Sequence, residues 1–107
     1  MKTEVFLTLL DTWLKKIKDI SAKKGHDYAN SQDHILNFKN VYKACQIFDV
    51  DPRRSPEDVA NFFRIVKMLR IVNLRDRDPQ NESVLDSELD DLTYHFLYLA
   101  CKEDKNV

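Results

Sequence analysis

The stretch SPEDVANFFRIVKMLRIVNL, residues 55–74, decides the fold of this chain. It opens with a strong helix start: Ser55 at the N-cap, Pro56 at the first helical position, and Asp58 three residues after the cap. The residues that follow are apolar around most of the helical circumference, which is typical of a helix in the middle of a domain. We therefore expect a central helix over residues 56–75.

Three further helices are expected around the central one, over residues 3–24, 33–49 and 83–102, because apolar residues recur there at spacings of three and four. Gly25, the only glycine, is expected to end the first helix in a left-handed conformation. Ser83 and Asp86 have capping-box spacing at the start of the last helix. The core-facing stripe of that helix is expected to be Leu85, Leu89, Leu92, Phe96 and Leu99.

The composition places the chain in one class. With 107 residues, 43% of them hydrophobic and 33% charged, the sequence predicts a single compact, all-α, four-helix domain over residues 1–107. One glycine excludes glycine-rich phosphate loops. No apolar run reaches the roughly 20 residues that a membrane span needs. Cys45 and Cys101 are 56 positions apart and are expected to be reduced thiols in a cytoplasm.

Charge is unevenly distributed along the chain. Residues 51–77 carry a net charge of +3, whereas residues 78–107 carry 2 basic against 8 acidic residues, a net charge of −6. The acidic end argues against binding of duplex DNA, which requires a basic face. The charge distribution is compatible with binding of a small anionic ligand.

Several polar residues lie where the apolar pattern does not explain them. Lys67, Arg70 and Asn73 follow one another at spacings of three in the central helix, and Asp86 and Asp90 lie on the last helix. One interpretation is a row of donors for phosphate or carboxylate groups. The alternatives are an ordinary solvated strip and an internal set of salt bridges between the two helices.

Three stretches taken together resemble a known family. KGHDYA at residues 24–29 with Asn37, KMLRIVNL at residues 67–74 and NESVLDSELDDLTYH at residues 81–95 are similar to the small nucleotide modification associated domains of phages and bacteria. These domains are distantly similar to the MazG-like all-α nucleoside triphosphate pyrophosphohydrolases. The resemblance implies a MazG-like helical bundle and a nucleotide ligand.

The metal-binding set of the MazG-like enzymes is incomplete in this sequence. In those enzymes two facing pairs of carboxylates hold Mg²⁺, which activates water. Here Asp90 together with Asp86 or Glu82 stands for one pair, at a spacing of four rather than three, and no helix supplies the other pair. We therefore expect no catalytic residues, no metal site and no cofactor, with Mg²⁺ at these three acids as the alternative.

The resemblance implies a set of ligand-binding residues. We expect them to contact phosphate, sugar and base, or to orient the cations that do: Lys24, His26, Asp27, Tyr28, Asn37, Lys67, Arg70, Asn73, Asp90 and Tyr94. The expected function is binding or sequestration of a nucleotide or a nucleotide-derived immune signal without hydrolysis, in the host cytoplasm if a phage encodes the chain. A chain this short forms a pocket most easily between subunits, so we expect a homo-oligomer. The alternatives are a Mg²⁺-dependent pyrophosphohydrolase and a helical adaptor without a small-molecule ligand.

Overall fold

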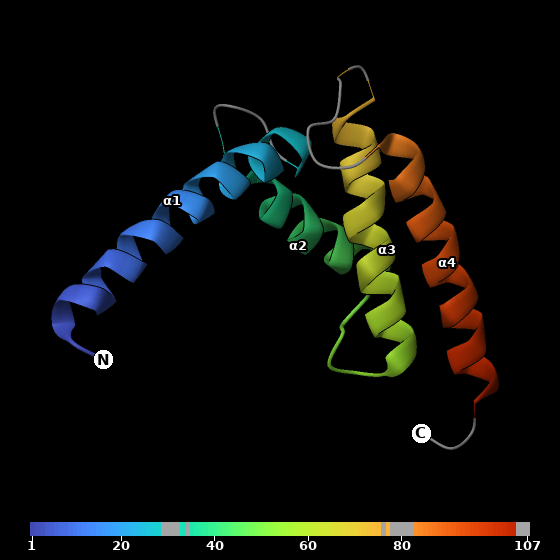
Figure 1. Ribbon diagram of the computed structural model, residues 1–107. Coiled ribbons are helices and arrows are strands. Elements are labelled where there is room, and N and C mark those ends of the chain that lie inside the picture. The colour runs from blue at the N-terminus through green and yellow to red at the C-terminus, as the bar shows by residue number, and fades with distance from the viewer. Residues whose placement is uncertain (29–32, 34, 76, 78–82, 105–107) are drawn as a thin grey trace.

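The computed structural model describes residues 1–28, 33, 35–75, 77 and 83–104, without the side chains of residues 25–28. Its helices are α1 (Thr3–Tyr28), α2 (Leu36–Phe48), α3 (Pro56–Asn73) and α4 (Val84–Glu103), and these ranges contain no strand (Figure 1). The all-α, four-helix prediction is confirmed. Nowhere along the described residues does a helix combine the length and apolar character that a bilayer-crossing segment needs.

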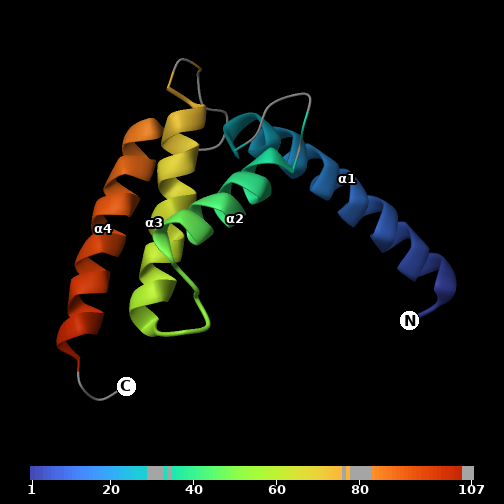
Figure 2. The same ribbon diagram turned by 180° about the vertical axis from the view of Figure 1, so that it is seen from behind.

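Helix α3 is the central element, as its apolar sequence predicted. It packs side by side with α4 and also contacts α2 and α1 (Figures 1 and 2). The predicted cap is present: the Ser55 hydroxyl accepts a hydrogen bond from the Asp58 backbone N–H at 3.1 Å, and Pro56 opens the helix. Ala60 and Ile65 are buried on this helix. The start of α3 thus follows from local sequence alone.

Helix α2 begins three residues later than predicted. The Asp33 carboxylate accepts a hydrogen bond from the Ile35 backbone N–H at 3.0 Å, a local contact that turns the chain before the helix. The helix ends at Phe48, and Asp49 takes a left-handed conformation with φ 53°. An aspartate tolerates this region better than most residues other than glycine. The turn at Asp49 directs the chain into the start of α3.

The prediction that Gly25 ends the first helix is wrong. Helix α1 continues to Tyr28, and no glycine in the described ranges has a positive φ. A single glycine inside a helix costs only about 1 kcal/mol relative to alanine, which helical hydrogen bonds on either side offset. Residues 25–28 therefore form the last turn of α1 and not the start of a loop.

Helix α4 is rotated relative to the prediction. The residue that it buries completely is Ser87. The stripe expected to form the core is 41–62% exposed: Leu85, Leu89, Leu92, Phe96 and Leu99. The core assignment of this stripe is therefore wrong. The side of α3 that faces α4 carries cations. Only the polar face of α4 supplies the oxygen atoms that these enclosed cations need.

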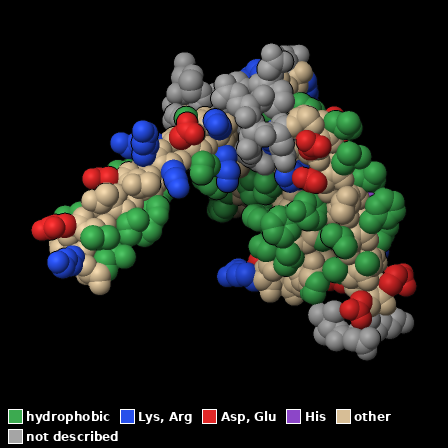
Figure 3. All heavy atoms as spheres, in the orientation of Figure 1, with side chains coloured by type: hydrophobic (Ala, Val, Ile, Leu, Met, Phe, Trp, Pro, Cys, Tyr) green, Lys and Arg blue, Asp and Glu red, His purple; other side chains and the backbone are tan. Residues whose placement is uncertain are grey.

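Helix α1 projects away from the other three helices (Figures 1 and 2). Its apolar stripe is exposed as well, and Figure 3 shows hydrophobic side chains along the underside of the projecting helix. The radius of gyration is 17.5 Å, whereas a globular chain of this length has about 13 Å. The chain on its own therefore leaves much of its apolar surface in water.

Candidate functional site

Three cations of α3 form a row along the interface with α4. Arg64, Lys67 and Arg70 are three residues apart, and each has a partner on α4. We call these three residues the cation row. Because α3 and α4 lie side by side, the row runs along the line where the two helices meet. Two of its members, Lys67 and Arg70, were predicted as ligand-binding residues.

Arg70 is the most deeply buried member of the cation row. It has 0% exposure, and its Nη1 donates to the Ser87 hydroxyl and, at 3.3 Å, to the Ser83 carbonyl oxygen. The side chain thus joins the end of α3 to the first turn of α4. Since a buried guanidinium is costly without acceptors, these contacts hold the two helices at a fixed spacing.

Lys67, one helical turn before Arg70 on α3, forms an ion pair with Asp90 on α4. The Lys67 Nζ lies 3.0 Å from an Asp90 carboxylate oxygen, and the two side chains are 16% and 45% exposed. The cation is therefore enclosed by protein, while its anion is open to solvent. Lys67 and Asp90 were both predicted as ligand-binding residues, and the structure brings them together.

Arg64 makes a contact that the sequence did not suggest. Its Nε donates to Asp91 at 2.9 Å, and its Nη1 lies 3.0 Å from His95 Nδ1. Because arginine only donates, His95 Nδ1 is the acceptor in this contact. Neither Asp91 nor His95 was among the residues predicted from the sequence to form a site. Their i, i+4 spacing opposite a cation at position 64 is the signal that was available.

Tyr94 lies on the same interface but packs against an aromatic ring. Its ring stacks on Phe63 with centroids 5.2 Å apart and planes at 19°. The predicted role of Tyr94 as a ligand-binding residue stays a prediction, with one face of the ring already covered by Phe63.

The remaining predicted residues are not members of the cation row. Asn73 follows Arg70 on α3, and its side-chain oxygen accepts from Arg77 at 3.4 Å. Asn37 is in the first turn of α2, where its buried Oδ1 has no hydrogen-bond partner among the described residues. Lys24 is exposed near the end of α1. The side chains of His26, Asp27 and Tyr28 lie outside the described part of the chain.

The two described acids of the alternative metal site, Asp86 and Asp90, are each engaged in a contact of their own. Asp86 closes the capping box of α4 with Ser83, and Asp90 pairs with Lys67. Glu82 lies outside the described residues. Within the described ranges, no three His, Cys, Asp or Glu side chains are close enough together to hold a metal ion.

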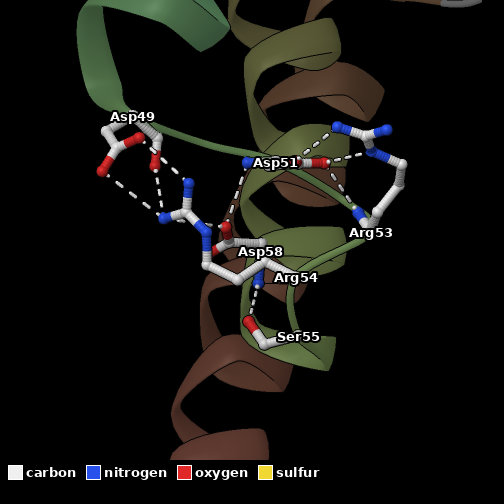
Figure 4. Close-up of polar contacts among 6 residues, drawn as sticks. All are labelled: Asp49, Asp51, Arg53, Arg54, Ser55 and Asp58. Carbon is white, nitrogen blue, oxygen red and sulfur yellow. Dashed lines mark hydrogen bonds and ion pairs between the residues drawn. The ribbon is translucent and has the colours of Figure 1, made fainter.

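The connection between α2 and α3 carries a second polar network, which sequence reasoning missed (Figure 4). Asp51 holds Arg53 through both carboxylate oxygens, at 3.1 and 3.0 Å. Arg54 binds Asp49 at 3.0 Å and Asp58 at 3.5 Å. The hydrogen bonds from Arg53 lower the pKa of Asp51 to about 2. The two aspartates followed by two arginines in residues 49–54, between two helices, were the available signal.

Two open pockets flank this connection. One, of about 590 Å³, lies on the α2 side and is lined by Phe38, Tyr42 and Phe62. The other, of about 690 Å³, lies between the start of α3 and the end of α4. Arg53 and Arg54 border both pockets. Cys45, in the first pocket, has its pKa raised by burial and by the charge of Asp51, and both cysteines are free thiols, as predicted.

Comparison with known proteins gives no relative from which a role can be transferred. No family model, no curated protein and no solved structure matches the chain.

Proposed function

We propose that the protein binds a nucleotide or a nucleotide-derived signal without hydrolysing it. The observation that supports this proposal is the cation row, because cationic side chains are the groups that bind phosphate through strong, charge-assisted hydrogen bonds. The proposal includes the homo-oligomer and the cytoplasmic location expected from the sequence. The resemblance to nucleotide modification associated domains supports the choice of ligand.

Lys67 is the residue of the row that we assign to direct phosphate contact. Its ammonium group is enclosed, whereas Asp90 is about half exposed. A phosphate group of the ligand can therefore take the place of the Asp90 carboxylate beside the Lys67 ammonium group. Lys67 then has an anionic partner both with and without the ligand. Arg70, which is fully buried, acts as a positioning residue that fixes α3 against α4.

A helical adaptor without a small-molecule ligand is the second candidate. The observation that favours it is that every cation of the row already has a partner within the protein. Under this interpretation the row only fastens α4 to α3. A Mg²⁺-dependent pyrophosphohydrolase needs acids from a neighbouring chain, since those described here do not form a cluster.

A thermal-shift screen separates the three functions. The panel contains mono- and triphosphates, cyclic di- and trinucleotides and ADP-ribose derivatives, each with and without Mg²⁺. We expect stabilisation by at least one nucleotide without Mg²⁺, and recovery of that nucleotide intact after denaturation of the protein. Recovery of a cleaved nucleotide only with Mg²⁺ supports the hydrolase. The absence of any shift supports the adaptor.

Two substitutions test the assigned contact. Lys67→Gln should weaken the binding of the stabilising nucleotide roughly tenfold or more, because it removes a charge-assisted hydrogen bond. Lys39→Gln is the matched control, since Lys39 also pairs with an aspartate, Asp33, at 2.7 Å. Asp90→Asn should tighten binding, because it removes the competing anion. A loss of turnover in Asp90→Asn would instead indicate a hydrolase.

A further inference from the structure

The largest unexplained feature of the molecule is its exposed apolar surface. The accessible area is 8152 Å², whereas a compact chain of this mass exposes about 6,200 Å². The excess is about 1,900 Å² per chain. Two chains that cover this excess bury an area within the range of roughly 2,000–5,000 Å² that obligate homodimers show.

The exposed residues on α1 and α4 follow the same spacing. On each helix five apolar residues are separated by four, three, four and three positions: Phe6, Leu10, Trp13, Ile17 and Ile20 on α1, and Leu85, Leu89, Leu92, Phe96 and Leu99 on α4. We call these sets the α1 stripe and the α4 stripe. Their members are 41–62% exposed. This spacing is the heptad pattern of helices that pack through knobs in holes.

The two stripes also match in length. Residues 6–20 and 85–99 both span 15 positions, which is about 21 Å of helix. Within one chain the stripes do not meet, since α1 projects on the side of α3 opposite to α4 (Figures 1 and 2). An α1 stripe and an α4 stripe can therefore cover each other completely only when they come from different chains.

Charge selects the antiparallel direction for this pairing. The second half of α1 is basic, with Lys15, Lys16 and Lys18, whereas the first half of α4 is acidic, with Asp86 and Glu88. An antiparallel arrangement places these halves together and opposes the helix dipoles favourably. It also leaves the apolar residues 5–14 of α1 against the apolar second half of α4.

A specific register follows from the antiparallel direction. Ile20 faces Leu85, Trp13 faces Leu92 and Phe6 faces Leu99, while Leu10 and Ile17 lie one position away from facing Phe96 and Leu89. In this register Lys16 and Glu88 both lie beside the stripes, one position away from facing each other directly and within reach of a long side chain. Both side chains are exposed, and neither has an ion pair among the described residues.

We propose that the protein is a two-fold symmetric homodimer in which the α1 stripe of each chain packs antiparallel on the α4 stripe of the other. Two-fold symmetry repeats the contact, so the dimer contains two α1–α4 pairs and two Lys16–Glu88 ion pairs. This arrangement rests on the proposed homo-oligomer but not on nucleotide binding. The occupant of both exposed faces is a second copy of this chain.

Light scattering of the full chain tests whether the dimer exists. We expect a mass twice the chain mass of 12.7 kDa. Trp13→Glu should produce a monomer, since it places a charge in the middle of the α1 stripe. Thr12→Glu, the neighbouring exposed position outside the stripe, should stay a dimer. A monomeric wild type overturns both this proposal and the homo-oligomer.

Charge reversal tests the pairing of the helices. Lys16→Glu and Glu88→Lys should each raise the dimer dissociation constant about tenfold, because attraction becomes repulsion at two sites. The double variant Lys16→Glu/Glu88→Lys should restore the wild-type value. Lys18→Glu, the same charge change beyond the interface, should have a much smaller effect. A dimer whose affinity the double variant does not restore contradicts the α1–α4 pairing while the homo-oligomer stands.

Cross-linking identifies the chain that supplies each helix. A zero-length carbodiimide joins Lys16 to Glu88 only when the two groups are in contact. In an equal mixture of unlabelled and isotope-labelled protein, we expect mass spectrometry to find this link between one labelled and one unlabelled peptide. A Lys16–Glu88 link found only within single chains, or none at all, overturns the proposal.

Discussion

Arg70 shows how one residue can hold two helices together. Its guanidinium is completely buried and reaches across the interface to Ser87 and to the Ser83 carbonyl oxygen. The sequence marked this arginine as unusual because it interrupts an apolar helix. It did not reveal that the partners are a serine and a main-chain carbonyl, which carry no recognisable charge pattern.

Replacement of Arg70 should destabilise the fold. We expect Arg70→Ala to lower the free energy of unfolding by about 3 kcal/mol, because it leaves a cavity and removes the donor for the buried Ser87 hydroxyl and the part-buried Ser83 carbonyl oxygen. Arg70→Met, which fills most of the space, should cost less. Urea unfolding at one fixed protein concentration measures both values. Arg75→Ala, at an exposed arginine, should stay within about 0.5 kcal/mol of wild type; an equal loss there would contradict the assignment.

Asp51 gives the chain a defined response to acid. Its pKa of about 2, held down first by the hydrogen bonds from Arg53, is lower than the ordinary carboxyl value. The contribution of Asp51 to stability is therefore complete above pH ~4 and is lost as the pH falls through about 2. In Arg53→Ala, an NMR titration of the Asp51 carboxyl should show a midpoint near the ordinary value of about 3.9. Lys43→Ala, on the exposed face of α2, should leave the midpoint unchanged.

At the level of helices, local sequence explains the ends better than the faces. The caps of α3 and α4 were predicted correctly, because a cap is a contact between residues three positions apart. The end of α1 was not, because one glycine permits a helix end without requiring it. The orientation of α4 was predicted wrongly for a different reason, since it depends on the cations of α3.

The cap of α3 can be tested by substitution. Ser55→Ala should lower the free energy of unfolding by about 1 kcal/mol, because it removes the acceptor for the Asp58 backbone N–H. Ser55→Asp supplies another acceptor at the same position and should retain most of the stability. Thermal and urea unfolding of both variants provide the measurement. Equal losses in the two variants would mean that the hydroxyl acts through something other than the cap.

At the scale of the whole molecule, assembly and stability should be linked. If two chains cover each other's exposed stripes, mass action makes the folded state depend on protein concentration. We expect the melting temperature to rise steadily over a roughly hundredfold range of concentration in wild type. The rise should disappear in Trp13→Glu, which removes assembly. A concentration-independent melting temperature in wild type would show that a single chain is the stable unit.

The sequence by itself determined the helical class, the central place of α3, the caps at Ser55 and Ser83, and the unusual character of Lys67 and Arg70. These features depend on contacts within one or two helical turns or on the number of apolar residues around a helix. Only the tertiary structure decided the pairing of Lys67 with Asp90 and of Arg64 with Asp91, the network around Asp51, and the exposure of the α1 and α4 stripes. Periodicity identifies the apolar face of a helix but not what covers it. The enclosed cations of α3 require oxygen ligands. The polar face of α4 therefore packs against α3, and the leucines of α4 are exposed.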